Sequence, residues 1–119
     1  MLSIKDYKIF FGPFLSHEEL KVGAVVKIEN KASRIIDDFT LRLWIEGLNS
    51  KREPVQLVIV EHLYLKPGLE NISNLSGVLF YPLITEEGKP YYYTCTLELL
   101  DKHEKVVERH REKCRIQMP

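Results

Sequence analysis

Alanine is nearly missing from this sequence, which has it only at Ala24 and Ala32. Alanine has the highest intrinsic helix propensity, so its scarcity disfavours helices. The β-branched and aromatic residues that suit half-buried, pleated surfaces are plentiful instead. Composition therefore favours strands.

Long apolar runs are also missing. The longest clean one is Leu57 to Val60, far short of the roughly 20 residues that a membrane-spanning helix needs. The N-terminal segment MLSIKDYKIFFG contains Lys5 and Asp6 and has no hydrophobic stretch of signal-peptide length. We therefore predict a cytoplasmic protein with no membrane span.

A net charge is absent as well, because 17 Lys and Arg balance 17 Asp and Glu. No long-range field draws the whole chain toward nucleic acid, so a nucleic-acid partner is not expected. The 119 residues fall within the usual size of one domain. We predict a single domain over residues 1–119.

Only two cysteines are present, Cys95 and Cys114. This number is too small for a disulfide framework, and the missing signal peptide points to a reducing compartment. We expect free thiols.

Apolar residues recur at every second position in several segments, which is typical of strands. A first strand is predicted from Ile4 to Phe11, ending at Gly12-Pro13. The capping-box pattern Ser16-His17-Glu18-Glu19 then predicts one helical turn.

Two clear alternations follow in the next thirty residues. One face of the second strand carries Val22, Ala24, Val26 and Ile28, and this strand stops near Asn30. One face of the third carries Phe39, Leu41, Leu43 and Ile45, which leaves Thr40, Arg42, Trp44 and Glu46 opposite. A turn is expected over Gly47 to Lys51.

The middle of the chain is less regular. After Pro54 the apolar segment VQLVIVEHLYL indicates a strand covered on both faces, ending at Pro67-Gly68. A polar loop and a weak strand over Val78 to Tyr81 follow. Alternation is strong again from Tyr91 to Leu100, where Tyr91, Tyr93, Cys95, Leu97 and Leu99 share a face.

The last segment fits two structures. A helix would place Val107, His110, Cys114 and Met118 on one stripe. A strand after a hairpin loop at Asp101 to Glu104 would turn Cys114, Ile116 and Met118 inward and Arg109, Arg111, Lys113 and Arg115 outward. We favour the strand, which makes the fold an all-β antiparallel sandwich of about seven strands.

Two segments resemble immunoglobulin-like modules. VVKIENKASRIIDDFTLRLWIEG is similar to their opening hairpin, as found in CARDB-type, adaptin ear and major sperm protein-like domains. YYYTCTLELLDKHEKVV resembles their last hairpin, and Tyr93-Thr94-Cys95 echoes the Tyr-x-Cys of an immunoglobulin strand. The resemblance implies an immunoglobulin-like fold whose members mostly bind proteins or sugars.

The sequence departs from antibody domains in two respects. No cysteine lies near the second strand to pair with Cys95, and Trp44 is out of phase with the apolar face of its strand.

A zinc site could be imagined from Cys95, His103, His110 and Cys114, since thiolate and imidazole are preferred ligands. If the hairpin turns at Lys102-His103, Cys95 lies opposite His110, and Cys114 is roughly 13 Å farther along at the strand rise. Ligands of one ion must converge within about 2.3 Å. We predict no metal site.

Catalysis is not predicted either. No activated Cys or Ser stands in a pattern with a base and an orienting group. The carboxylate pairs Glu18-Glu19, Asp37-Asp38 and Glu86-Glu87 fall in expected turns, where solvated charge is the ordinary explanation. We expect no enzyme, and no cofactor. A deep polar pocket around His62, His110 or Cys95 would reopen the question.

One surface feature does suggest a function. If the third strand and the last two are neighbours, their outward residues form one aromatic and basic face: Trp44, Arg42, Tyr92, Arg109, Arg111, Lys113 and Arg115. Trp, Tyr and Arg are enriched at binding hot spots. A solvated face, or a charged device against aggregation, explains the basic residues at least as well.

Our leading hypothesis is a noncatalytic protein-binding or assembly module that uses this face or an open strand edge. Its partner would be another protein or a second copy of the chain. A carbohydrate-binding module, with Trp44 and Tyr92 stacking on sugar rings, is the alternative.

Overall fold

The structure, a computed structural model, describes residues 1–16, 18–48, 52–80 and 91–116. These residues form seven strands: β1 (Leu2–Ser16), β2 (Glu19–Asn30), β3 (Thr40–Leu48), β4 (Pro54–His62), β5 (Gly68–Phe80), β6 (Tyr91–Leu100) and β7 (Val106–Ile116). Nothing in this part of the chain is helical, and it therefore offers no apolar helix that could cross a membrane.

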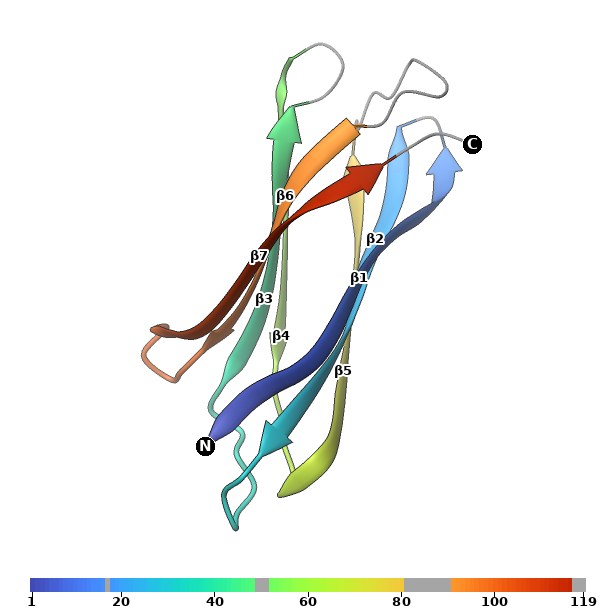
Figure 1. Cartoon of the computed structure of the whole chain (residues 1–119). Helices are drawn as coiled ribbons and strands as arrows, with labels where there is room; N and C mark the ends of the chain where they lie inside the picture. The colour runs from blue at the N-terminus through green and yellow to red at the C-terminus, as the bar shows by residue number, and fades with distance from the viewer. Residues whose placement is uncertain (17, 49–51, 81–90, 117–119) are drawn as a thin grey trace.

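The strands form two sheets, in the orders β1-β2-β5 and β4-β3-β6-β7, and every strand pair is antiparallel. The two sheets face each other as the layers of a sandwich (Figure 1). The structure confirms the predicted all-β antiparallel sandwich, including the prediction that the third strand and the last two are neighbours.

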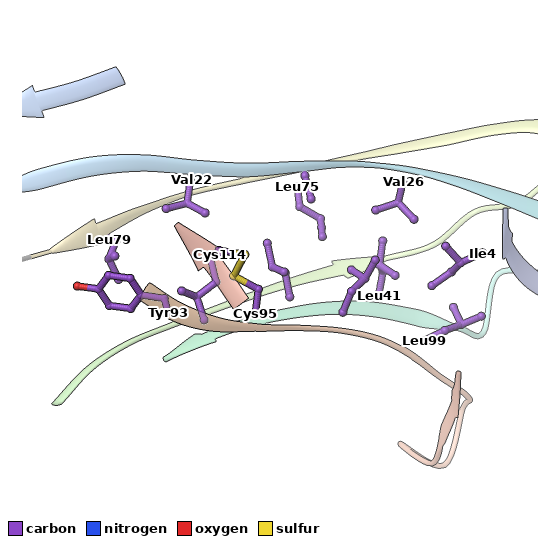
Figure 2. Close-up of a cluster of buried hydrophobic side chains, with 14 of the residues drawn as sticks. Ile4, Val22, Val26, Leu41, Leu75, Leu79, Tyr93, Cys95, Leu99 and Cys114 are labelled. Atoms are coloured by element: carbon purple, nitrogen blue, oxygen red, sulfur yellow. A yellow bond between two sulfur atoms is a disulfide. The ribbon is translucent and has the colours of Figure 1, made fainter. Parts of the chain in front are cut away.

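The core lies between the two sheets because the apolar positions of each strand recur with a period of two. The predicted inner faces of β2 and β3 are fully buried, and so are Cys95, Leu97 and Leu99 of β6. Figure 2 shows members of this core, among them Val22 and Val26 from one layer and Leu41 and Leu99 from the other, pointing into the space between the layers. Phe39 packs against the core from just before β3.

The first strand is longer than predicted. It passes through Gly12-Pro13, and its pairing with β2 resumes at Phe14 opposite Leu20 after a register shift. Gly12 has a φ of 116°, a conformation that glycine adopts readily. Because β1 is an edge strand, Pro13 needs no ladder partner and the strand continues.

The predicted helical turn after Ser16 is wrong. Ser16 and Glu19 are opposed in the ladder between β1 and β2, so the chain reverses there in a tight hairpin. The Ser16 hydroxyl donates to Oε1 of Glu19 at 3.0 Å and accepts the Glu18 N–H at 3.2 Å. The side chains that suggested a capping box stabilise a β-turn instead; His17 lies outside the described residues.

The prediction for β4 is wrong in its coverage and its end. This strand forms one edge of the four-stranded sheet, and it ends at His62 rather than at Pro67. Its outward residues Val58 and Val60 are 45% and 59% exposed. A continuous apolar run indicated cover on both faces, but here only one face meets another layer.

The predicted polar loop after Pro67 is part of β5, which runs from Gly68 to Phe80. Asn, Ser and Gly are depleted in strands, which explains the error. Eleven pairings with β2 hold the segment extended, with Leu75 and Leu79 buried in the core. Tyr81 and most of the turn predicted after Gly47 lie outside the described residues.

The last segment is a strand, as favoured, and the helix alternative is wrong. Cys114 and Ile116 are buried, while Met118 lies outside the described residues. The hairpin before β7 is closed by Asp101, whose carboxylate accepts the N–H groups of His103 and Lys105. The pKa of Asp101 is lowered, chiefly by the Lys105 bond.

This hairpin also sets a register that differs from the predicted one. A shift between Leu99 and Leu100 places Cys95 opposite Glu112, and Leu97 opposite His110. Glu104, with a φ of 60°, takes the left-handed position that such a bulged turn requires.

The expectation of free thiols is wrong. Cys95 and Cys114 form a disulfide between β6 and β7, with their Cα atoms 6.2 Å apart (Figure 2). In the observed register Cys114 is one diagonal step from Cys95 on the same face, well within disulfide reach. The bond joins neighbours within one sheet rather than the two layers.

Candidate functional site

The outer face of the four-stranded sheet is the candidate site, and it is built by cross-strand rows. Since Leu41, Leu43 and Ile45 point into the core, Arg42 and Trp44 must point out. The ladders then align three rows across β4, β3, β6 and β7: Val60, Arg42, Glu98 and Arg109; Val58, Trp44, Thr96 and Arg111; Gln56, Glu46, Thr94 and Lys113. Tyr92 and Arg115 are opposed beyond the last row.

All seven residues predicted for the site therefore lie on one face. The sequence pattern identified this grouping because alternation along each strand and the neighbour order both proved correct. Their roles in binding are a separate matter, which depends on how each side chain is held.

An ion network occupies one end of this face. The carboxylate of Glu98 is 2% exposed and lies between two arginines. Arg42 donates to Oε1 from Nε at 3.0 Å and from Nη2 at 2.7 Å. Arg109 donates to Oε2 from Nε at 2.9 Å, and its Nη2 lies 2.7 Å from the same oxygen. Arg42 and Arg109 are thus held within the sheet and share one negative charge.

The network sets the ionisation of Glu98. Burial by itself raises the pKa of this carboxyl, but the hydrogen bonds and charges of Arg42 and Arg109 outweigh burial and lower the pKa. Glu98 therefore remains ionised, and the network of Glu98, Arg42 and Arg109 carries a net charge of +1.

The rest of the basic row lies outside this network. Arg111 donates from Nε to the hydroxyl of Thr96 at 3.3 Å, while Lys113 and Arg115 are exposed. Tyr92 is 56% exposed on the neighbouring strand. Positive charge on the face is therefore concentrated toward the end of β7 that carries these three residues.

Trp44 is half-buried in the middle row. It lies between Val58 and Thr96 in the ladders, and on the face turned away from β1 and its sheet. Its indole N–H is buried and has no hydrogen-bond partner in the described part of the chain. A buried tryptophan N–H usually finds a partner, so this one is an exception.

Val58 and Val60 belong to the site and were missed by sequence reasoning. They extend the face onto β4 beside Trp44 and Arg42, and they are the most exposed apolar side chains of that strand. Their alternation with Leu57 and Ile59 was a usable signal of a one-sided strand. We call Val58, Val60 and Trp44 the apolar patch.

The acidic residues of β7 do not neutralise this face. Glu108 and Glu112 point to the other side, toward β1, where Oε1 of Glu108 accepts the Ile4 N–H at 3.0 Å. The Tyr7 hydroxyl donates to Glu112 at 3.3 Å. Burial, followed by the nearby charge of Glu112, raises the Tyr7 pKa.

Two grooves lie beyond the three rows, and of the predicted site residues only Arg115 lines one of them. One of about 710 Å³ is lined by Phe11, Gly12, Pro13, Phe14, Leu20, Arg115 and Ile116. The other, of about 500 Å³, runs between β4 and β5 past His62. Its Asn71 side chain is engaged with the backbone N–H and carbonyl of Lys66. His110 is elsewhere, paired with Glu108 beside Tyr7.

Known structures resemble this fold. A domain of a calcium-binding mutant of Bacteroides uniformis β-glucuronidase 2 matches with a TM-score of 0.63 and 15% identity, over 90% of this chain and 12% of that chain. A protein from Archaeoglobus fulgidus matches at 0.59 and 11%, over 98% of both chains. Amycolatopsis orientalis exo-chitosanase CsxA matches at 0.53 and 8%, over 94% of this chain and 12% of that one.

These likenesses show the fold alone. The chain spans only 12% of the β-glucuronidase that it resembles. No protein-family model and no curated protein matches the sequence.

Proposed function

We propose that this domain is a noncatalytic, immunoglobulin-like protein-binding module, and that its outer four-stranded face receives an acidic partner protein. The observation that carries the proposal is the placement of Trp44. This aromatic side chain lies half-buried on a sheet face that the other described strands leave uncovered, between two exposed valines and a basic row. The apolar patch lies toward the β4 edge of the face and the basic row toward β7, and binding faces combine apolar area with charged margins in this way.

The charge distribution supports an acidic partner. On the three aligned rows and the Tyr92–Arg115 pair, five basic side chains accompany only Glu46 and Glu98. Glu98 is committed to Arg42 and Arg109. Excess positive charge remains around Arg111 and Lys113, which would speed encounter with an acidic surface and orient it.

The buried indole N–H of Trp44 supports the same proposal. An unsatisfied polar group lowers the stability of a fold, and such groups are retained where function requires them. In the module as proposed, a partner that shifts the neighbouring side chains supplies the missing acceptor.

Partner capture from the native host tests the proposal, with Trp44→Ala and Arg111→Glu as the perturbing variants. Both should lose most of the captured partner, because hot-spot tryptophan and arginine side chains contribute about 2 kcal/mol or more each. Tyr64→Ala is the matched control, since Tyr64 is 62% exposed and lies in the groove between β4 and β5.

Circular dichroism must show that each variant is folded. Equal capture by the wild type and both variants would refute the proposed face. Binding to a glycan array that depends on Trp44 would replace the protein partner by a carbohydrate.

A further inference from the structure

A sandwich of two open sheets has four edge strands, here β1 and β5 in one sheet and β4 and β7 in the other. An edge presents backbone N–H and C=O groups that can pair with another strand. Natural edges are blocked by charges, bulges, proline or poor strand formers. The four edges of this domain differ in how far they are blocked.

Three of the described edges carry such devices. The ladder of β1 with β2 has three register shifts, and lysines stand at Lys5 and Lys8. The sequence of β7, VVERHREKCRI, is charged on both sides of the strand. The sequence of β5, GLENISNLSGVLF, is rich in asparagine, serine and glycine, which are weak strand formers.

Strand β4 carries such residues only near its ends, at Pro54 and Glu61. Its ladder with β3 runs through nine consecutive pairs without a shift, from Leu48 opposite Pro54 to Thr40 opposite His62. No charged residue occurs from Val55 to Val60, and five of these six residues are aliphatic. An edge without register shifts, whose central residues are uncharged and include exposed Val58 and Val60, is a site for strand addition.

We propose that β4 pairs antiparallel with β4 of a second copy of this chain, about a two-fold axis at Val58. This inference rests on the strand-edge part of the binding hypothesis and names its partner. Antiparallel pairing about a residue keeps inward and outward side chains on their own faces. Two four-stranded sheets then join into one continuous sheet.

The sequence of β4 selects both the partner and the register. Val58 is the middle residue of Pro54–His62, so an axis there pairs all nine residues. On the inner side Leu57 meets Ile59 of the second copy, and both side chains are only partly covered in the single chain. An axis at Ile59 would pair only seven residues of the strand and set Leu57 against the charged Glu61, whereas the axis at Val58 sets Val55, near the end of the strand, against it.

The pairing also explains the exposed valines. Val58 of each copy meets its equivalent across the axis, and Val60 lies beside Gln56 of the other copy. Two apolar patches thereby merge, with the Trp44 of each copy one strand farther out. A self-complementary contact of this kind forms a closed dimer.

Sedimentation analysis over a concentration series tests the proposal. The wild type should shift from 14.0 kDa toward twice that mass. Val58→Lys and Val58→Glu should each remain single chains, because each sets like charges opposite one another at the axis. An equimolar mixture of the two variants should recover the doubled mass, since lysine then faces glutamate.

Ile72→Lys is the control. Ile72 is 61% exposed on the outer side of edge strand β5, so this variant should dimerise like the wild type. A wild type that stays single at all concentrations, a dimeric Val58→Lys, a mixture without recovery, or a dissociated Ile72→Lys would each overturn the proposal.

Dimerisation through β4 can be tested separately from partner binding at the outer face of the four-stranded sheet. Arg111 lies three strands away from the edge, so Arg111→Glu should retain the dimer while losing the acidic partner. A wild type that stays a single chain but still captures the acidic partner would reject the β4 pairing alone.

Discussion

Replacing Glu98 by glutamine removes the charge on which two arginines converge, with little change in shape. The carboxylate is 2% exposed, and it accepts hydrogen bonds from Arg42 and Arg109. Glutamine keeps one acceptor oxygen and turns an NH₂ group toward one guanidinium. We expect Glu98→Gln to destabilise the fold at neutral pH.

The size of the effect follows from the exposure of the three side chains. Breaking a fully buried ion pair costs about 3–5 kcal/mol. Arg42 and Arg109 are 32% and 51% exposed, so water can solvate them once the carboxylate is gone. We therefore expect a loss of about 2 kcal/mol, which lowers the melting temperature by roughly 8 °C in a domain of this size.

The pH dependence identifies the mechanism. Because the folded-state pKa of Glu98 lies below its usual value of 4.5, the stabilisation is fully present above that pH. It is lost as the pH falls through the lowered folded-state value. The difference between wild type and Glu98→Gln, measured by thermal unfolding under circular dichroism, should thus be full at pH 7 and shrink below about 4.5.

Glu46→Gln is the control, because Glu46 is an exposed glutamate on the same face and should change stability little. A free energy of unfolding for Glu98→Gln within about 0.5 kcal/mol of the wild-type value would contradict this account, because breaking a buried ion pair costs several times more. So would a difference that stays constant from pH 7 to pH 3.

Two further changes test the packing. Cys114→Ser should cost about 3 kcal/mol, because the disulfide closes a loop with a sequence separation of 19. Alkylation followed by intact-mass measurement should find no free thiol in protein taken from its native host. Two alkylated cysteines would contradict the disulfide and would agree with the reducing, cytoplasmic environment predicted from the sequence. Gly47→Ala should cost roughly 1–3 kcal/mol by overpacking, since the added Cβ would lie 2.5 Å from Cδ1 of the buried Tyr93. Leu48→Ala, at a 54% exposed neighbour, is its control, and equal melting temperatures for the two variants would argue against that contact.

The sequence predicted the strands with strong alternation and misjudged those shaped by their neighbours. β2, β3 and β6 could be predicted directly because apolar residues repeat at every second position on the face that each turns to the core. β5 has little such pattern, and its pairing with β2 overrides the weak strand propensity of Asn and Ser.

The same contrast applies to the candidate site. Alternation placed Trp44 and the basic residues on one face, which needs only the direction of each side chain. It could not show that Glu98 binds two of the arginines, because that depends on the register between three strands. The disulfide was not predicted because the observed register of the last hairpin differs by two residues from the predicted one.

The disulfide lies within one sheet, and this limits what its cleavage can do. The two layers are held together by side chains of the core, and the disulfide makes no covalent link between the layers. Reduction would therefore allow the edge strand β7 to separate locally from β6. The packing between the two layers would remain.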